Sequence, residues 1–276
     1  MAVSLLQYFG VISWLSVWLT PVFTLIGLPG ESSVVFISSI FLPLYAPIAI
    51  IATLPLSMRE ITILALMCLI SHNMIVESAI QKKTGSSYLT MFLVRIFSSF
   101  TAAFFLNFML PDKINGNHVI TEGIVHADLW AMLLHWAKSA GNLTVRIVLI
   151  ITALMILQNI LKEFKILDSL SKTFAPLMGI FGLPKESSFL WFVGQILGLT
   201  YGSAVMIEQV EQKVISRKDS NLLNYHIAIN HSLLEDTLLF VAIGVPVLWI
   251  TFPRIFLAMV VVWVVRLFIL KNRGKF

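Results

Sequence analysis

Charged residues are scarce in this chain. Of its 276 residues only 12% are charged, whereas 58% are hydrophobic and the mean hydropathy is +0.91. A soluble domain carries roughly 25% charged residues on its surface, so the composition excludes an ordinary soluble protein and predicts an all-α integral membrane protein. The only cysteine, Cys68, lies in an apolar segment, which excludes a disulfide framework and a thiolate metal cluster.

The motifs of common enzymes are also missing. The chain has no His-Glu-x-x-His zinc motif, no Gly-x-Ser-x-Gly elbow and no phosphate-binding loop. We therefore expect no enzymatic activity and no cofactor. The net charge of +5 does not point to a nucleic acid polymer as partner, because in a membrane protein the location of the positive charges matters more than their sum.

The sequence contains an internal repeat. Three pairs of segments match in the same order, the first at an offset of 155 and the others at 159: 21–33 with 176–188, 71–78 with 230–237, and 95–97 with 254–256. The two copies therefore align along their length with one four-residue insertion in the second copy, between the first and second matches. Three matches in one order predict that the chain holds two copies of one structural unit.

Each copy divides into the same parts. A first helix is followed by a Gly-Leu-Pro-x-Glu-Ser-Ser turn, and then by a segment broken at 43–47 in one copy and at 198–202 in the other. The pieces beside each break are too short to cross a hydrocarbon core of about 30 Å, so we expect a re-entrant hairpin of two half-helices. The expected crossing helices, three per copy, are 3–20, 60–80 and 88–110, then 143–161, 221–245 and 252–271.

The connector decides how the copies are oriented. It holds a short amphipathic stretch at 128–138 that we expect to lie on the membrane interface, with Trp130 and Trp136 at headgroup depth. If the connector does not cross, three crossings per copy force the second copy to be inverted. The expected organisation is therefore a first repeat at 1–110, an extracytoplasmic connector at 111–141 and an inverted repeat at 142–276.

The lysines and arginines agree with this topology. On the expected cytoplasmic face lie Lys82, Lys83, Lys162, Lys165, Lys172, Lys185, Lys213, Arg217, Lys218, Lys271, Arg273 and Lys275. On the opposite face lie only Arg59, Lys113, Lys138, Arg146 and Arg254. The excess follows the positive-inside rule and predicts a multi-pass protein of the plasma (cytoplasmic or inner) membrane with both termini cytoplasmic.

Four residues at the starts of the expected hairpins are candidate site residues: Glu31, Ser32, Glu186 and Ser187. They could line a polar site where two half-helices begin, as broken helices do in inverted-repeat transporters. The alternative is that the acids only cap their helices, since a carboxylate in a first turn suits the free N–H groups and the helix dipole.

Ionisable residues also lie within the expected crossings. His72 and Glu77 are in one helix, and His231, Glu235 and Asp236 are in its counterpart. An ionisable group at depth costs roughly 2.5–3.5 kcal/mol on insertion scales and normally faces the protein interior or water. Helical geometry places His231 and Glu235 on one face, whereas His72 and Glu77 diverge by about 140°.

Asn73 and Ser232 add neutral hydrogen-bonding groups beside the two histidines, and the repetition favours a functional site. The alternative is a polar pair that fixes one helix to another. His72 and His231 are candidate metal ligands, but two ligands do not define a metal site. Arg95 and Arg254 could pair with Glu77 or Asp236, or extend to the headgroups. In the hairpin tips Tyr45 and Tyr201, with Gln195, could contact a solute or simply pack.

The chain resembles the Gate, or nucleoside-recognition, family of membrane domains. The resemblance rests on Gly-Leu-Pro-Gly-Glu-Ser at 27–32 and Gly-Leu-Pro-Lys-Glu-Ser at 182–187, each opening a broken hairpin, and it covers the chain apart from the connector. Related domains occur in concentrative nucleoside transporters, in the ferrous-iron transport protein B and in bacterial spore maturation proteins. This sequence departs from them in having no cysteine in either hairpin and in lacking the extra scaffold helices of the full nucleoside transporters.

These observations predict a secondary carrier that works by alternating access, with the broken hairpins as gates. The site acids and histidines would bind a small polar solute, nucleoside-like as the resemblance implies, or a coupling H⁺, Na⁺ or divalent cation. Two alternatives stay open: a transporter of a divalent metal such as ferrous iron, and a non-transporting protein that binds a ligand or partner. Besides the lipid bilayer, a second copy of the chain could be a partner.

Overall fold

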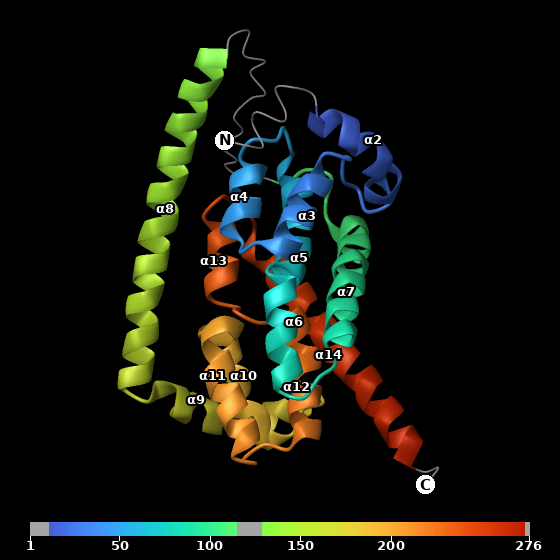
Figure 1. The fold of residues 1–276 in the computed structure, drawn as a ribbon, viewed down its shortest axis with the longest axis vertical. Helices are drawn as coiled ribbons and strands as arrows, with labels where there is room; N and C mark the ends of the chain where they lie inside the picture. The colour runs from blue at the N-terminus through green and yellow to red at the C-terminus, as the bar shows by residue number, and fades with distance from the viewer. Residues whose placement is uncertain (1–10, 115–128, 274–276) are drawn as a thin grey trace. The chain divides into compact units, whose positions relative to one another are not determined.

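The described part of the chain is helical throughout. The computed structural model describes residues 11–114 and 129–273, and no strand occurs in these ranges (Figure 1). Four segments within them are long and apolar enough to cross a bilayer: Met58–Lys83, Tyr88–Met109, Trp130–Glu163 and Val247–Phe268. The prediction of an all-helical chain with several apolar helices is confirmed.

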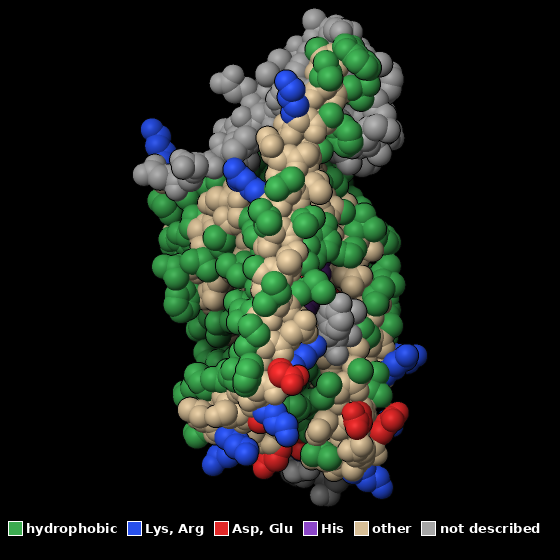
Figure 2. Space-filling model, turned by 90° about the vertical axis from the view of Figure 1, so that its left-hand side faces the viewer, with side chains coloured by type: hydrophobic (Ala, Val, Ile, Leu, Met, Phe, Trp, Pro, Cys, Tyr) green, Lys and Arg blue, Asp and Glu red, His purple; other side chains and the backbone are tan. Residues whose placement is uncertain are grey.

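Polar and apolar side chains are distributed as in a membrane protein. Phe108 is 71% exposed, whereas the guanidinium-bearing side chains of Arg95 and Arg254 are 0% exposed. On the face drawn in Figure 2 the exposed side chains are mostly hydrophobic. Exposed phenylalanines beside buried arginines would be unfavourable in water, but the arrangement suits a hydrocarbon surround with polar groups facing the protein interior.

The described residues belong to two compact units that exchange parts of the chain. Unit 1 comprises Met1–Asn73, Ser99–Thr152 and Leu238–Ile250, and unit 2 comprises Met74–Ser98, Ala153–Thr237 and Thr251–Phe276. Helix α6 (Met74–Lys83) comes from the first copy but belongs to unit 2, which is built mainly by the second copy. Its counterpart in the second copy is α13 (Glu235–Val241), and most of that helix belongs to unit 1.

Unit 1 is built mainly from the first copy. Its helices are α2 (Val11–Thr24), α3 (Ser32–Phe41), α4 (Tyr45–Ile51) and α5 (Met58–Ser71), with the ends of α7 (Tyr88–Met109) and α13 (Glu235–Val241) and the start of α8 (Leu129–Glu163). The rings of Phe23, Phe36 and Phe100 pack edge to face, with centroids 5.2–6.2 Å apart. They join α2, α3 and α7 through a geometry that aromatic pairs prefer.

Unit 2 contains the counterparts of these helices. They are α6 (Met74–Lys83), α9 (Ile166–Phe174), two 3₁₀ turns (Ala175–Gly179 and Lys185–Ser187), α10 (Ser188–Ile196), α11 (Gly198–Glu211), α12 (Arg217–Ile229) and most of α14 (Val247–Arg273). Its apolar core includes Trp191, Leu223 and Val262, and Phe181 stacks on Trp191 with centroids 5.5 Å apart.

The two Gly-Leu-Pro turns have the same local geometry. Gly27 has a φ of 74° and Gly182 a φ of 73°, in the left-handed region that favours glycine. The next residue in each turn, Leu28 or Leu183, donates its N–H to the carbonyl five residues earlier, at 3.0 and 2.9 Å. A Cβ on Gly27 would lie 2.0 Å from Oδ1 of Asn107, so any other residue there would also have to displace that side chain.

The starts of α5 and α12 also correspond. Ser57 accepts a hydrogen bond from the N–H of Glu60 and forms a capping box with that residue, and Ser216 accepts from the N–H of Asp219 in the same way. These caps satisfy N–H groups that have no partner inside the helix. The repeat detected in the sequence is therefore also a repeat of local structure.

Two of the expected crossing helices are not continuous. The expected helix at 60–80 divides into α5 and α6 at His72 and Asn73, and the expected helix at 221–245 divides into α12 and α13 with five non-helical residues between them. Apolar composition alone did not reveal these breaks, because the residues on both sides remain hydrophobic. The expected breaks at 43–47 and 198–202 occur close by, between α3 and α4 and at Leu197.

The short interfacial helix expected at 128–138 is not a separate helix. Residues from Leu129 onward, including Trp130 and Trp136, are the first turns of the 35-residue helix α8, which Figure 1 shows as one unbroken helix. At 1.5 Å per residue α8 is about 52 Å long, well beyond a hydrocarbon core of about 30 Å. At the N-terminus, α2 is described from Val11 to Thr24, and the earlier part of the expected helix at 3–20 lies outside the described residues.

Candidate functional site

In unit 1 the break after α5 meets the break between α3 and α4. Asn73, which has a φ of 47°, donates its N–H to the carbonyls of Ser39 at 2.8 Å and Leu42 at 3.1 Å. The hydroxyls of Ser39 and Ser71 lie 2.9 Å apart and are buried. We call this meeting of two helix breaks junction 1.

Unit 2 repeats the arrangement. Ser232, also with a φ of 47°, donates its N–H to the carbonyl of Gly194 at 2.8 Å, where α10 nears its end. A serine in the left-handed region is uncommon, and such strain persists where the surrounding structure enforces it, often at functional sites. We call the meeting of the α10–α11 break with the link between α12 and α13 junction 2.

Junction 2 is lined by amide side chains. The Gln195 amide donates to the carbonyl of Asn230 at 2.6 Å, and the Asn230 amide donates to Oε1 of Gln195 at 3.4 Å. From α8, the Gln158 amide donates to the carbonyl of Ile196 at 3.0 Å and to Oε2 of Glu235 at 3.3 Å. These bonds satisfy carbonyls that the broken helices cannot satisfy themselves.

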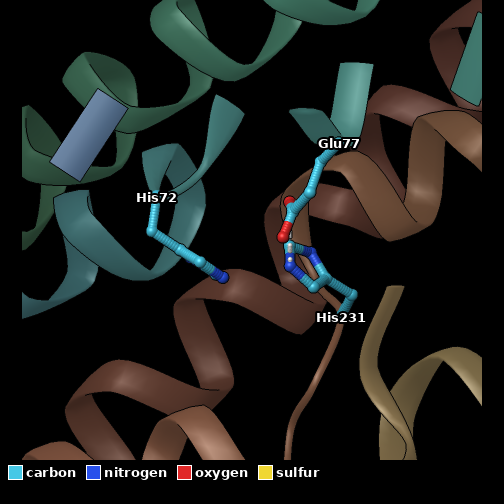
Figure 3. A group of neighbouring side chains, drawn as sticks. All are labelled: His72, Glu77 and His231. Atoms are coloured by element: carbon cyan, nitrogen blue, oxygen red, sulfur yellow. Dashed lines mark ion pairs between the residues drawn. The ribbon is translucent and has the colours of Figure 1, made fainter. Parts of the chain in front are cut away.

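A buried charged cluster lies beside the same link. Nη1 of Arg95 is 2.7 Å from Oε2 of Glu77, and Nε2 of His231 is 3.2 Å from the same oxygen. All three side chains are at most 3% exposed. Figure 3 shows the carboxylate of Glu77 and the imidazole of His231 directed toward each other. The pairing of Arg95 with Glu77, one of the two considered from the sequence, is confirmed.

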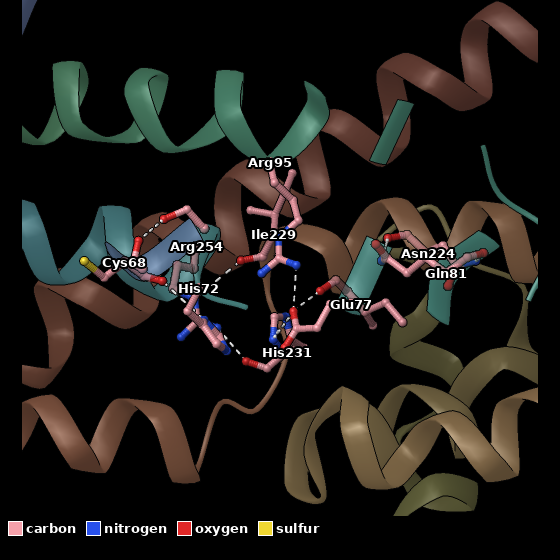
Figure 4. Close-up of polar contacts among 12 residues, drawn as sticks. Cys68, His72, Glu77, Gln81, Arg95, Asn224, Ile229, His231 and Arg254 are labelled. Atoms are coloured by element: carbon pink, nitrogen blue, oxygen red, sulfur yellow. Dashed lines mark hydrogen bonds and ion pairs between the residues drawn. The ribbon is translucent and has the colours of Figure 1, made fainter. Parts of the chain in front are cut away.

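Arg254 holds the C-terminal end of α12. Its Nη2 donates to the carbonyl of His231 at 2.5 Å and its Nε to the carbonyl of Ile229 at 3.5 Å (Figure 4). It also interacts electrostatically with Asp236 and Glu77. A cation at a helix C-terminus and acids in the first turns of α6 and α13 all suit the helix dipoles. The count of positive charges placed Arg254 on the outer face of the membrane. Arg254 is in fact fully buried, so it does not mark that face.

A second polar network joins the end of α6 to α12. The Asn224 amide donates to the carbonyl of Gln81 at 3.3 Å, to Oγ1 of Thr84 at 2.9 Å and to Oγ of Ser86 at 2.8 Å. In return the Gln81 amide donates to the carbonyl of Asn224 at 3.0 Å, and Figure 4 shows this pair. We call these four residues the polar seam.

The hairpin-start residues occupy similar places in the two units. Ser32 and Ser187 are 0% exposed, and neither hydroxyl has a hydrogen-bond partner among the described residues. Glu31 precedes α3 without a side-chain capping bond, and Glu186 is exposed. Glu31 lies in unit 1 and Glu186 in unit 2. The capping alternative is thus not realised for Glu31 through its side chain.

The two histidines do not lie within continuous helices, contrary to the prediction from the sequence. His231 lies in the link before α13, so His231 and Glu235 do not share one face of a continuous helix, and their polar partners differ. His72 ends α5, and its Nδ1 lies 3.2 Å from the carbonyl of Cys68. His72 and Asn73 belong to unit 1, whereas Glu77 belongs to unit 2. Whether either histidine binds a metal stays a prediction.

The aromatic candidates are less informative. Tyr45 begins α4 and is 39% exposed, while the side chain of Tyr201 lies outside the described residues. Sequence reasoning did not anticipate the polar seam or Gln158. The sequence signal for the seam is weak, because α6 and α12 carry charged residues as well as the amides of Gln81 and Asn224.

Comparison with known proteins agrees with the membrane assignment. The chain is 34% identical over 251 residues, 89% of its length, to the "Uncharacterized membrane protein YvoD" of Bacillus subtilis (strain 168), and the match covers 80% of that relative. No family model and no solved structure matches. The extent and identity of the match show that the chain is a membrane protein of the YvoD family.

Proposed function

We propose that this chain is a secondary carrier that moves a small polar solute across the cytoplasmic membrane by alternating access. Its two copies cross the bilayer in opposite directions, each with three crossings and a re-entrant hairpin, and both termini are cytoplasmic. The lead cargo is a nucleoside-like solute, on the resemblance of the Gly-Leu-Pro-x-Glu-Ser segments to nucleoside-recognition domains.

One observation carries the proposal: in each unit, two helix breaks meet at a hydrogen-bonded junction. The N–H of Asn73 reaches the end of α3, and the N–H of Ser232 reaches the end of α10, both at 2.8 Å. Broken helices are expensive in a membrane unless their free N–H and C=O groups line a protein-enclosed or watery site. Inverted-repeat transporters use such breaks to bind solutes and ions.

Unsatisfied polar groups in unit 2 support a polar cargo. The hydroxyls of Ser78, Ser187 and Thr237 and Nη1 of Arg254 are buried, and none has a hydrogen-bond partner among the described residues. A buried donor without a partner costs roughly 1–3 kcal/mol, so several of them in one unit call for a partner that the described residues do not supply. A solute rich in hydroxyl and carbonyl groups would provide it.

The exchanged helices support alternating access. α6 belongs to unit 2 and most of α13 to unit 1, so each unit contains chain from both copies. A movement of one unit would therefore act on the break between α5 and α6 and on the break between α12 and α13. The geometry at Glu77 favours an organic solute over a divalent metal, because the guanidinium of Arg95 occupies the same carboxylate oxygen at 2.7 Å and repels a second cation.

Uptake into proteoliposomes tests the proposal. The purified full chain should give saturable uptake of radiolabelled uridine or adenosine above empty liposomes. Glu235→Val, which introduces the residue found at the equivalent position 76, should lower uptake by about tenfold, the effect of one lost hydrogen bond. Glu208→Gln, at an exposed carboxylate on α11, is the matched control and should leave uptake unchanged.

The competing functions give different results. Saturable uptake of Fe²⁺ without nucleoside uptake would identify a metal transporter. No saturable flux of either probe from a folded protein would overturn the transport proposal and leave a ligand- or partner-binding role.

A further inference from the structure

The tautomer of His231 is determined by its hydrogen bonds. Its Nδ1 lies 2.8 Å from the carbonyl oxygen of Ile227. A carbonyl can only accept a hydrogen bond, so Nδ1 must carry the proton of the imidazole ring. The same contact recurs in the first copy, where Nδ1 of His72 lies 3.2 Å from the carbonyl of Cys68.

This tautomer leaves Nε2 of His231 facing a carboxylate. Nε2 lies 3.2 Å from Oε2 of Glu77, and the two side chains are only 1% and 3% exposed (Figure 3). In a neutral imidazole with its proton on Nδ1, Nε2 has only a lone pair, and a carboxylate oxygen also has only lone pairs. Two acceptors at this distance in a buried place repel each other unless a proton lies between them.

The surrounding charges favour placing that proton on the histidine. Arg95 from α7 forms an ion pair with the same carboxylate oxygen of Glu77 at 2.7 Å. Arg254 from α14 donates to the carbonyl of His231. Asp236 and Glu235, at the start of α13, are further acids of unit 2, and Asp236 interacts electrostatically with both Arg254 and Glu77.

We propose that the Glu77–His231 pair is the binding site of a transported proton, so that H⁺ is the coupling ion of the carrier. This inference rests on the proposed transport function. In each cycle a proton from water on one side binds Nε2 of His231, and it is later released to water on the other side, with no other change in either residue. Sodium is disfavoured here, because an imidazole nitrogen is a poorer ligand for a hard cation than oxygen is.

Nitrogen NMR of the histidine rings tests the site without requiring transport. The full chain, with ¹⁵N-labelled histidine in lipid nanodiscs near neutral pH, contains six histidines, and the His231 signals are those missing from His231→Gln. We expect both ring nitrogens of His231 to be protonated in the wild type. Glu77→Gln should convert His231 to the neutral form, whereas Glu208→Gln should not. A neutral His231 in the wild type would overturn the inference, even if Glu77→Gln fails to fold.

A flux measurement then separates the two proposals. If nucleoside uptake occurs, a pH gradient of one unit, acidic outside, should raise accumulation about tenfold for each coupled proton. His231→Gln should remove this response. Uptake that ignores the gradient in the wild type would refute proton coupling and leave the carrier intact. A protonated His231 without any flux would instead refute transport while retaining the proton site.

Discussion

Junctions 1 and 2 have the same backbone and different side chains. In both, a residue with a φ of 47° donates its N–H at 2.8 Å to a carbonyl near the end of a half-helix. Two positions of junction 2 are Gln195 and Asn230, whereas the equivalent positions of junction 1 are Ile40 and Ser71. The repeat thus preserves the break, and the chemistry that could recognise a solute is concentrated in unit 2.

The polar seam shows the same difference. Gln81, Thr84 and Ser86 contact Asn224 in unit 2, but their equivalents in unit 1 are Phe240, Ile243 and Val245, and the equivalent of Asn224 is Ala65. Phe240 and Ala65 are 0% exposed, so unit 1 buries apolar side chains where unit 2 buries amides. At these positions unit 1 is apolar, and unit 2 carries the polar groups.

The largest expected effect comes from the buried ion pair of unit 2. Arg95→Ala leaves Glu77 buried without its guanidinium partner and should lower the free energy of unfolding by about 3–5 kcal/mol, measured in mixed micelles. The double variant Glu77→Gln with Arg95→Gln should recover part of this loss, because no uncompensated charge remains. Strictly additive losses would show that the two side chains are not coupled.

The polar seam should contribute less. Asn224→Ala removes the partner of three side chains or carbonyls and should cost about 2–3 kcal/mol of unfolding free energy. Asn221→Ala is the matched control, since Asn221 accepts a single side-chain bond, from Ser86, among the described residues, and it should cost about 1 kcal/mol. Equal effects of the two substitutions would contradict the importance given to the seam.

Exchanging one residue between the junctions tests which of them serves a solute. Gln195→Ile introduces the side chain of junction 1, removes two hydrogen bonds with Asn230 and should cost about 1–2 kcal/mol of stability. Nucleoside uptake should fall about tenfold. The reciprocal change, Ile40→Gln, should leave uptake within a factor of about two. A larger loss from Ile40→Gln would assign the solute to junction 1.

The smallest effects should be equal in the two copies. Ser57→Ala and Ser216→Ala each remove an N-cap hydroxyl that accepts an N–H three residues later, and each should cost about 1 kcal/mol. Thermal unfolding in detergent would measure both. A clear difference between the two losses of stability would show that the same capping geometry stabilises the two units unequally.

The sequence predicted the architecture better than the site. Apolar composition predicted a helical membrane protein, and the repeated blocks located the Gly-Leu-Pro turns and the half-helix breaks, because glycine and proline act on the backbone locally. The breaks at His72 and His231 escaped prediction. Their cause is tertiary: the N–H of Asn73 or Ser232 bonds to a neighbouring half-helix, and no local residue type signals that partner.

The charged residues show the same limit. Glu77 and His231 were selected because ionisable groups are costly at depth, but their contact joins residues more than 150 positions apart. Arg254 was assigned to the membrane surface because it stands near a helix end, and the structure buries it against the carbonyls of Ile229 and His231. Spacing along one helix could not reveal either contact.

The central claim, that the two copies cross the membrane in opposite directions, is tested most directly by cysteine labelling. Pro55 and Val214 are exposed and equivalent at the offset of 159, and the native Cys68 is 0% exposed, which keeps the background low. We predict that a membrane-impermeant maleimide labels Pro55→Cys in intact cells and labels Val214→Cys only after permeabilisation. Labelling of both positions from the same side would contradict the inverted repeat.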